Sequence, residues 1–340
     1  MFTKDDFTGE IGGFELSITA GGSDLLFRPS AVAPPSPSLA PAPLFYEFGN
    51  LSSDEQVVAF AAVHGPLFGT RGWVPEDGAI RESVEDWKEA AGVLNHVLRL
   101  KAFCDGKAGV GDVSDFMHVI VATGARGFSL TASCSLFSGR REGAYRDLVR
   151  SARVGESYQG AGGERVVSGL SVDSLGAHVA TTYETFDYYP ALARGEQDRP
   201  FIDALASEGF PGDIAEECAR AVVRLCTMAH TSDVRFGFVE DSYGPVVECL
   251  LAGIWHEFGQ AYSHEAIGVC KECGRVIDCT NERGKQRDYC SKTCRDRARN
   301  RRNAPKMKLR RRMAAGMTVE EAARDSGVPI DEAKRLVGME

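Results

Sequence analysis

Four cysteines near the C-terminal end of the chain have the spacing of metal ligands. They form two short pairs, Cys270-x-x-Cys273 and Cys290-x-x-x-Cys294, separated by sixteen residues. Each pair can place two sulfur atoms along one edge of a tetrahedron, and the loop between the pairs brings them together. The pattern predicts one structural Zn²⁺ held by these four thiolates. Cys279 fits neither short pair, so we expect it to pack beneath the hairpin that precedes the second pair.

An arginine-rich stretch follows the last cysteine directly. Ser291 is a suitable N-cap, so we expect a helix that begins in the second cysteine pair and ends before Pro305. Like charges this dense repel one another unless a polyanion neutralises them, which points to phosphate contacts that are salt-sensitive and independent of base sequence. The predicted nucleic-acid-binding residues here and further along the chain are Arg295, Arg297, Arg299, Arg301, Arg302, Lys306, Lys308, Arg310, Arg311, Arg312, Lys334 and Arg335.

The cysteine region resembles a known family. Cys-x-x-Cys-Gly, a basic hairpin, Tyr-Cys-Ser-x-x-Cys and an arginine-rich helix are similar to the C-terminal finger of CGNR zinc-finger proteins. The tetrad that names the family reads Cys294-Arg-Asp-Arg297 in this chain. The resemblance covers roughly 270–303 and implies a treble-clef-like zinc finger, an N-terminal ABATE domain and a role in bacterial transcription regulation. Matching positions are Cys270, Cys273, Gly274, Tyr289, Cys290, Ser291, Cys294 and Arg297.

The last residues of the chain suggest a small helical unit. Thr318 and Glu321 form a capping-box pattern, Gly327 marks a turn, and 331–337 can form a second helix. This order is similar to the helix-turn-helix of bacterial regulators and recombinases. Asp331 and Glu332 stand where basic or polar base-reading residues would be expected. A helical pair that docks on protein is therefore the alternative.

The rest of the chain predicts an α+β fold with a helix-rich body. A hairpin is expected at 13–27, helices at 83–103, 213–229 and 243–262, and strands around 128–136 and within 164–188. The predicted segments are a small β-hairpin at 1–28, a proline-rich linker at 29–43, a mixed, acidic body at 44–265, the zinc finger at 266–303, and a basic helix with a candidate helix-turn-helix at 304–340.

Charge is segregated along the chain. Residues 270–340 carry nineteen lysines and arginines against eleven acidic residues, so the net charge of −9 leaves −17 on 1–269. Such asymmetry is expected when one end of a protein meets phosphate. The sequence shows neither a signal-peptide pattern nor an apolar span long enough for a bilayer, and ten cysteines then favour a reducing cytoplasm over a disulfide framework.

Three functional classes remain after this inspection. The first is a zinc-dependent DNA-binding protein, interpreted as a bacterial transcriptional regulator whose body senses an unknown ligand or protein partner, or dimerises. The second is an RNA-binding protein or an adaptor whose finger is structural. The third is an enzyme. The seven histidines are dispersed and His256-Glu257 lacks a second histidine at 260, so no catalytic motif is recognised and we expect no enzymatic activity.

Overall fold

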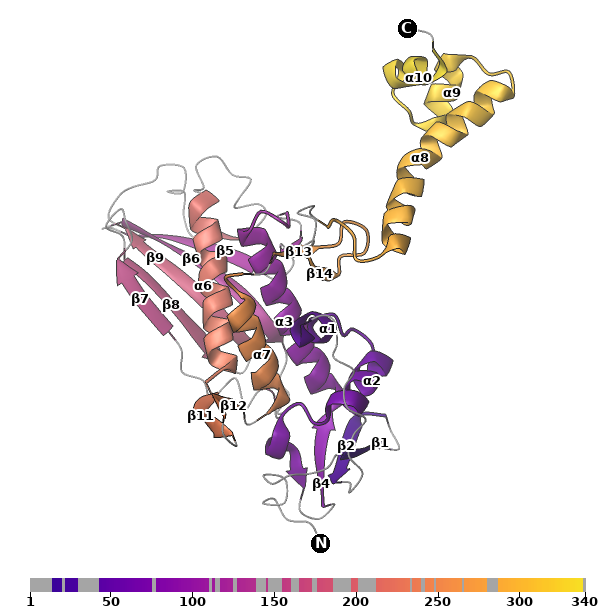
Figure 1. Cartoon of the computed structure of the whole chain (residues 1–340). Coiled ribbons are helices and arrows are strands. Elements are labelled where there is room, and N and C mark those ends of the chain that lie inside the picture. The colour runs from indigo at the N-terminus through magenta and orange to yellow at the C-terminus, as the bar shows by residue number, and fades with distance from the viewer. Residues whose placement is uncertain are drawn as a thin grey trace.

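The chain forms a body of sheets and helices from which a helical arm projects (Figure 1). The fold is that of a computed structural model. The residues that it describes are 14–19, 22–29, 43–74, 78–109, 112–113, 117–124, 127–138, 145, 155–159, 165–172, 176–185, 197–200, 212–232, 234–239, 242–247, 249–264, 266–279 and 287–338. The proline-rich linker prediction, apart from its two ends, lies outside these residues.

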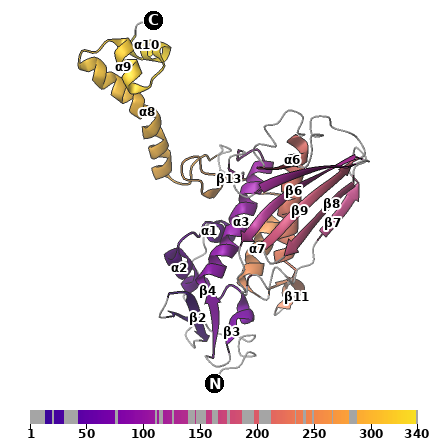
Figure 2. The same cartoon turned by 180° about the vertical axis from the view of Figure 1, so that it is seen from behind.

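A six-stranded antiparallel sheet lies on one side of the body (Figure 2). Its central strands include β6 (Gly127–Ser138) and β9 (Gly176–Thr185), which confirms the strands predicted around 128–136 and within 164–188. The strand order is β10 (Gln197–Pro200), β5 (Met117–Gly124), β6, β9, β8 (Arg165–Val172) and β7 (Gly155–Gln159).

Two long helices, α3 (Val84–Cys104) and α6 (Gly212–His230), pack on this sheet and on each other. Both were predicted from their apolar periodicity. In α3 the stripe that includes Trp87, Leu94 and Leu98 is fully buried. Two shorter helices add aromatic residues to the same core. Helix α7 (Leu250–Ala261) contributes Trp255 and Phe258, and helix α1 (Leu44–Gly49) contributes Phe45 and Phe48. These two helices place a second helical layer against α6 and α3.

A second, four-stranded sheet closes the other end of the body. The hairpin predicted at 13–27 is present as β1 (Phe14–Ile18) and β2 (Asp24–Pro29), and β2 pairs with β4 (Ala79–Ser83), which in turn pairs with β3 (Trp73–Val74). Leu25 and Phe27 of the hairpin are fully buried in the body core. The hairpin is thus built into the body. Helix α2 (Asp54–His64) lies beside it, capped by a reciprocal pair of Ser53 and Gln56.

The helix predicted at 243–262 is wrong in its first part. Residues Ser242–Val246 form strand β12, which pairs with β11 (Arg235–Val239), and the helix begins only at Leu250. Gly244 and Pro245 explain the difference, because glycine loses entropy in a helix and proline lacks the N–H of the helical ladder. A two-stranded hairpin tolerates both residues.

The C-terminal region consists of a short hairpin and three helices. Strands β13 (Ile267–Val269) and β14 (Val276–Asp278) precede α8 (Lys292–Ala314), α9 (Val319–Ser326) and α10 (Ile330–Val337). The expectation that Pro305 ends the first helix is wrong, because α8 continues through it to Ala314. Proline removes one helical hydrogen bond, and the exposed surroundings of Arg301 let water bind the carbonyl that this leaves unpaired. No helix in the described part of the chain is long and apolar enough to cross a membrane.

Candidate metal centre and its junction with the body

The four predicted ligands converge on one point at the base of the projecting arm. The Sγ atoms of Cys270, Cys273, Cys290 and Cys294 all lie within 4.8 Å of one another. The Cys273–Cys290 and Cys290–Cys294 sulfur pairs are 3.5 and 3.4 Å apart. A tetrahedral ion with metal–sulfur bonds of about 2.3 Å requires sulfur pairs about 3.8 Å apart. The cluster therefore has the composition and the dimensions of a four-thiolate metal site.

The first ligand pair sits on a tight turn between β13 and β14. The Cys270 amide donates to the carbonyl of Arg275 at 2.8 Å, and the Gly274 amide donates to the carbonyl of Cys270 at 2.9 Å. Gly274 has a φ of +73°, in the left-handed region that favours glycine. This turn directs both sulfurs of the pair to the same side of the hairpin.

The second pair is positioned by the start of α8. The Ser291 hydroxyl accepts a hydrogen bond from the Cys294 amide at 3.2 Å, which confirms Ser291 as the N-cap. Cys294 thereby lies in the first helical turn, where unpaired amides favour negative charge on sulfur. The two halves of the site are joined by Lys271, whose amide donates to the carbonyl of Asp288 and whose side chain pairs with the same residue at 2.8 Å.

The surroundings of two of the thiols shift their pKa values in opposite directions. Burial acts to raise the pKa of Cys270, but backbone N–H groups of Cys290, Glu272 and Cys273 outweigh it and lower that pKa to about 7. Burial and the neighbouring thiols of Cys294 and Cys273 raise the pKa of Cys290 to about 12. Backbone N–H groups therefore favour the thiolate of Cys270, whereas the neighbouring thiols oppose ionisation of Cys290. A dication at the centre would supply the charge that stabilises all four thiolates.

Cys279 lies outside the four-sulfur cluster, as predicted from its spacing. It is buried, and its Sγ is 3.2 Å from the carbonyl oxygen of Arg287. It packs with Ile277 and the ligands Cys270 and Cys294 in a small core beneath the hairpin. A Cβ added to Gly268 would stand 2.2 Å from the Cys279 sulfur, so the hairpin can close on Cys279 only because residue 268 is glycine.

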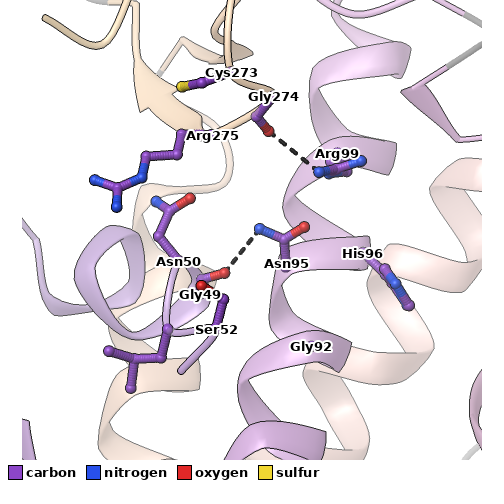
Figure 3. Close-up of a pocket in the computed structure, with 11 residues that line it drawn as sticks. Gly49, Asn50, Ser52, Gly92, Asn95, His96, Arg99, Cys273, Gly274 and Arg275 are labelled. Atoms are coloured by element: carbon purple, nitrogen blue, oxygen red, sulfur yellow. Dashed lines mark hydrogen bonds between the residues drawn. The ribbon is translucent and has the colours of Figure 1, made fainter. Parts of the chain in front are cut away.

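The hairpin that carries the first ligand pair is fastened to the body. Ile267, Val269 and Val276 belong to the body core. The Asn50 side chain, at the end of α1, pairs with the Val276 backbone as a strand would, because its Oδ1 accepts from the amide at 3.1 Å and its Nδ2 donates to the carbonyl at 3.0 Å. From α3, Arg99 Nη2 donates to the carbonyl of Gly274 at 3.2 Å, next to the ligand Cys273 (Figure 3).

Eleven of the twelve predicted nucleic-acid-binding cations divide into two groups, and the twelfth, Arg335, lies on α10 and belongs to neither. Five form ion pairs with acidic neighbours: Arg301 with Glu272, Lys306 with Glu332, Lys308 and Arg312 with Asp325, and Lys334 with Glu320. A second group, all on α8, is exposed and makes no ion pair within the described residues. Its members are Arg295, Arg297, Arg299, Arg302, Arg310 and Arg311.

The first half of α8 presents three of these arginines together. At about 100° per residue, Arg295, Arg299 and Arg302 fall within about 60° of one another around the helix. Arg301 is turned away from them and pairs with Glu272 at 2.7 Å, which ties the helix to the first cysteine turn. The predicted face of three arginines is therefore left open, and a residue from the other face serves the architecture of the site.

The end of α8 forms a C-terminal helical module with α9 and α10. Its core consists of Leu309, Val319, Ala322, Ala323, Val328 and Ala333, and it is separate from the body core. Thr318 and Glu321 form the predicted capping box, and Gly327, with a φ of +73°, begins the turn between α9 and α10. Asp331 and Glu332 lie in the first turn of α10, where they add negative charge.

Sequence inspection missed the residues that join the metal site to the body. Asn50 and Arg99 lie 226 and 175 positions from the backbone groups that they bind. Neither belongs to a motif, and no local pattern marks them. Comparisons of the chain with models of known protein families, with curated proteins and with solved structures find no match.

Proposed function

We propose that this chain is a zinc-dependent DNA-binding protein in which the four-cysteine site orients α8 for contact with phosphate. The observation that carries the proposal is the set of exposed arginines on α8 that have no acidic partner in the described part of the chain, on a helix whose first turn contains one of the four clustered cysteines. Guanidinium groups held in a row without neutralising carboxylates are suited to a phosphate backbone. The arm projects away from the acidic body, so a duplex can approach it (Figures 1 and 2).

Zn²⁺ is the ion that fits the donor set best. Four thiolates in a closed tetrahedral arrangement are typical of structural zinc, which takes no further ligand. The turn with Gly274 and the capped helix with Cys294 together form a treble-clef-like arrangement. This agrees with the resemblance to CGNR fingers, although only the first and last members of that tetrad occur here. A role in bacterial transcription regulation follows from that resemblance.

The C-terminal helical module supports α8 in this proposal and is not its base-reading element. The first turn of α10 presents Asp331 and Glu332, which would repel phosphate at the point where a recognition helix meets DNA. Lys308 and Arg312 are engaged by Asp325, so the module fixes the far end of α8. Affinity for DNA of any sequence would then come from the arginines that remain open.

The test compares arginines on the two sides of the same helix. Duplex binding is measured by fluorescence anisotropy over a range of salt concentrations for the full-length protein and for Arg295→Ala, Arg299→Ala and Arg302→Ala. Each change should weaken binding to all sequences and lower the salt slope by about one unit, because one phosphate contact is lost. Arg301→Ala is the matched control and should alter the slope much less. Equal effects on both sides, or a change in sequence preference alone, would refute the assignment.

RNA binding is the second candidate function, because phosphate contacts do not distinguish the two polymers. Competition between duplex DNA and a structured RNA of equal charge, across the same salt range, separates the candidates. DNA should compete better at every salt concentration. Stronger competition by RNA would indicate that the arginine face binds RNA. Binding of neither polymer at low salt would indicate that the finger is a structural module of an adaptor.

A further inference from the structure

A cavity lies between the body and the turn that carries the first two cysteines. Its volume is about 330 Å³, within the range of small-molecule sites. The walls come from the end of α1, from α3 and from the turn between β13 and β14 (Figure 3). The residues of the lining that carry the argument below are Asn50, Ser52, Asn95, Arg99, Gly274 and Arg275.

The cavity is positively charged. Arg99 and Arg275 both line it, and none of the lining residues is an aspartate or glutamate. Arg99 is half-buried, and its described partners are the backbone carbonyls of Asp112 and Gly274. Its Nε is buried and has no hydrogen-bond partner among the described residues. A partly buried guanidinium without a carboxylate is costly, and an anion would remove that cost.

Neutral polar groups complete the lining. The Asn95 amide donates to the carbonyl of Gly49 at 2.8 Å, and Asn50 binds the Val276 backbone, so both side chains are held in place (Figure 3). Ser52 and Arg275 are exposed and stand at the rim. Asn50 also donates to the carbonyl of Tyr46 at 2.7 Å, so its amide shapes the wall, whereas Asn95 can bind a hydroxyl group of a small molecule while Arg99 binds its anionic group.

We propose that this cavity is a binding site for a small metabolite that carries a phosphate or carboxylate group. Arg99 binds the anion, Arg275 adds positive charge from the rim, and Asn95 binds the remainder of the molecule. Because the walls belong to the body and to the cysteine turn, the bound molecule contacts both and stabilises their junction. The site does not depend on nucleic-acid binding, since its arginines are different from those on α8.

The test is ligand-dependent thermal stability of the zinc-loaded, full-length protein. Inorganic phosphate, glycerol 3-phosphate and succinate are titrated against chloride at constant ionic strength. At least one of them should raise the melting temperature saturably, because a ligand that binds the native state stabilises it. Arg275→Gln should weaken that binding by about two- to fivefold, the effect expected for loss of a positive charge at the rim. Arg275 is exposed, so this variant should fold normally.

A second variant and two controls keep the result specific. Ser52→Asp places a carboxylate at the rim and should abolish the stabilisation by repulsion. Arg28→Gln, on the exposed surface of β2, and Arg310→Gln, on α8, remove one positive charge elsewhere and should leave the stabilisation unchanged. Absence of any saturable effect in the wild-type protein, or its survival in both Arg275→Gln and Ser52→Asp, overturns the proposal. Loss of the effect in Arg310→Gln would assign the anion to the arm and also overturns it.

An added duplex distinguishes a metabolite from the phosphate of nucleic acid. Glycerol 3-phosphate, if it is the effective probe, should stabilise the protein equally with and without saturating duplex, and Arg275→Gln should bind duplex as well as the wild-type protein. If duplex displaces the probe and Arg275→Gln loses duplex affinity, the cavity is part of the nucleic-acid surface and the metabolite site is refuted. Failure of the α8 arginine test leaves this result unaffected, so the two proposals fail independently.

Discussion

The body and the cysteine finger are stabilised by different physical means. The body buries large apolar side chains such as Trp87, Trp255 and Phe258 between helices and a sheet. The finger buries Ile277, Cys279 and two of the metal-site cysteines, Cys270 and Cys294, and its largest described neighbours are only half-buried. So small an apolar core cannot offset the entropy of ordering the segment. If the four cysteines bind zinc as proposed, one chain uses hydrophobic burial for its acidic part and metal coordination for its basic part.

The two regions nevertheless meet without a linker. Strand β13 and Val276 of β14 are packed in the body core, while the remaining cysteine and arginine residues extend from them. The finger therefore begins inside the body, and Asn50 and Arg99 hold its first turn. In the proposed zinc-bound protein, the metal orders what lies beyond this attachment. A change in the body, in the finger or at their junction can therefore be tested for its effect on the region that is left intact.

The largest effect is expected from removal of the metal. Zinc binding to small thiolate modules contributes on the order of 10–16 kcal/mol, so chelation should unfold the finger beyond β14 while the body stays folded. Hydrogen exchange should show loss of protection in 287–300 and none in α3 or α6. Cys273→Ser should lose zinc in the same way, and Cys279→Ser, its matched control, should retain one zinc per chain. Retained structure in the metal-free finger would contradict the comparison.

The reverse experiment weakens the body and spares the finger. Leu94 is fully buried on α3, and Leu94→Ala should lower the free energy of unfolding of the body by about 2–5 kcal/mol through the cavity that it leaves. Denaturation followed by tryptophan fluorescence measures this change, because Trp87 and Trp255 are buried in the same core. Zinc content under native conditions should be unchanged. Loss of zinc in the folded variant would show that the two regions are not independently stabilised.

Acid should destabilise the body through one buried histidine. His230 is enclosed between the Tyr145 hydroxyl, 3.0 Å from Nε2, and the Cys226 carbonyl, 2.7 Å from Nδ1, and burial lowers its pKa from 6.5 to about 4. The unfolded chain therefore binds a proton that the folded body excludes. The contribution of His230 to the stability of the body is complete above pH 6.5. It is lost as the pH falls toward 4, by roughly 3 kcal/mol in all.

The control for this pH effect is a histidine of the same body. Burial raises the pKa of the Glu82 carboxyl to about 7, which acts in the opposite sense over the same pH range, so the measure is the difference in unfolding free energy between wild type and variant. For His230→Gln this difference should change between pH 6.5 and 4, and for His264→Gln, at an exposed position, it should stay constant. Urea denaturation at fixed pH values, followed by tryptophan fluorescence, makes the measurement. A difference between wild type and His230→Gln that does not change with pH would show that His230 does not exclude the proton.

The smallest effect is expected at the junction. Asn50→Ala removes two hydrogen bonds to the Val276 backbone and leaves that amide and carbonyl without their partner, at a cost of about 1–3 kcal/mol. The loss should appear as faster hydrogen exchange in β13 and β14, with the centre of α3 unaffected. Asn95→Ala removes a contact within the body only and is the control. Equal protection of β14 in both variants would indicate that apolar packing alone holds the finger to the body.

Local sequence patterns predicted the helices and strands of this protein better than the long-range contacts between them. The apolar stripe of α3, the hairpin at 13–27 and the caps at Ser291 and Thr318 were all correct, because each depends on residues a few positions apart. The prediction that a helix ends before Pro305 was wrong, because α8 is exposed there and water can replace the lost hydrogen bond. Asn50 and Arg99 were missed because their partners lie 226 and 175 residues away.

The sequence alone determined the set of four cysteines and the arginine face, because ligand spacing and helical period are encoded over short distances. Tertiary structure decided which cations remain available, because Glu272, Asp325 and Glu332 reach α8 only after the chain has folded. It also decided that the finger starts within the body core and that two arginines line a cavity there. Burial and ion pairing depend on the path of the whole chain, and no local pattern records that path.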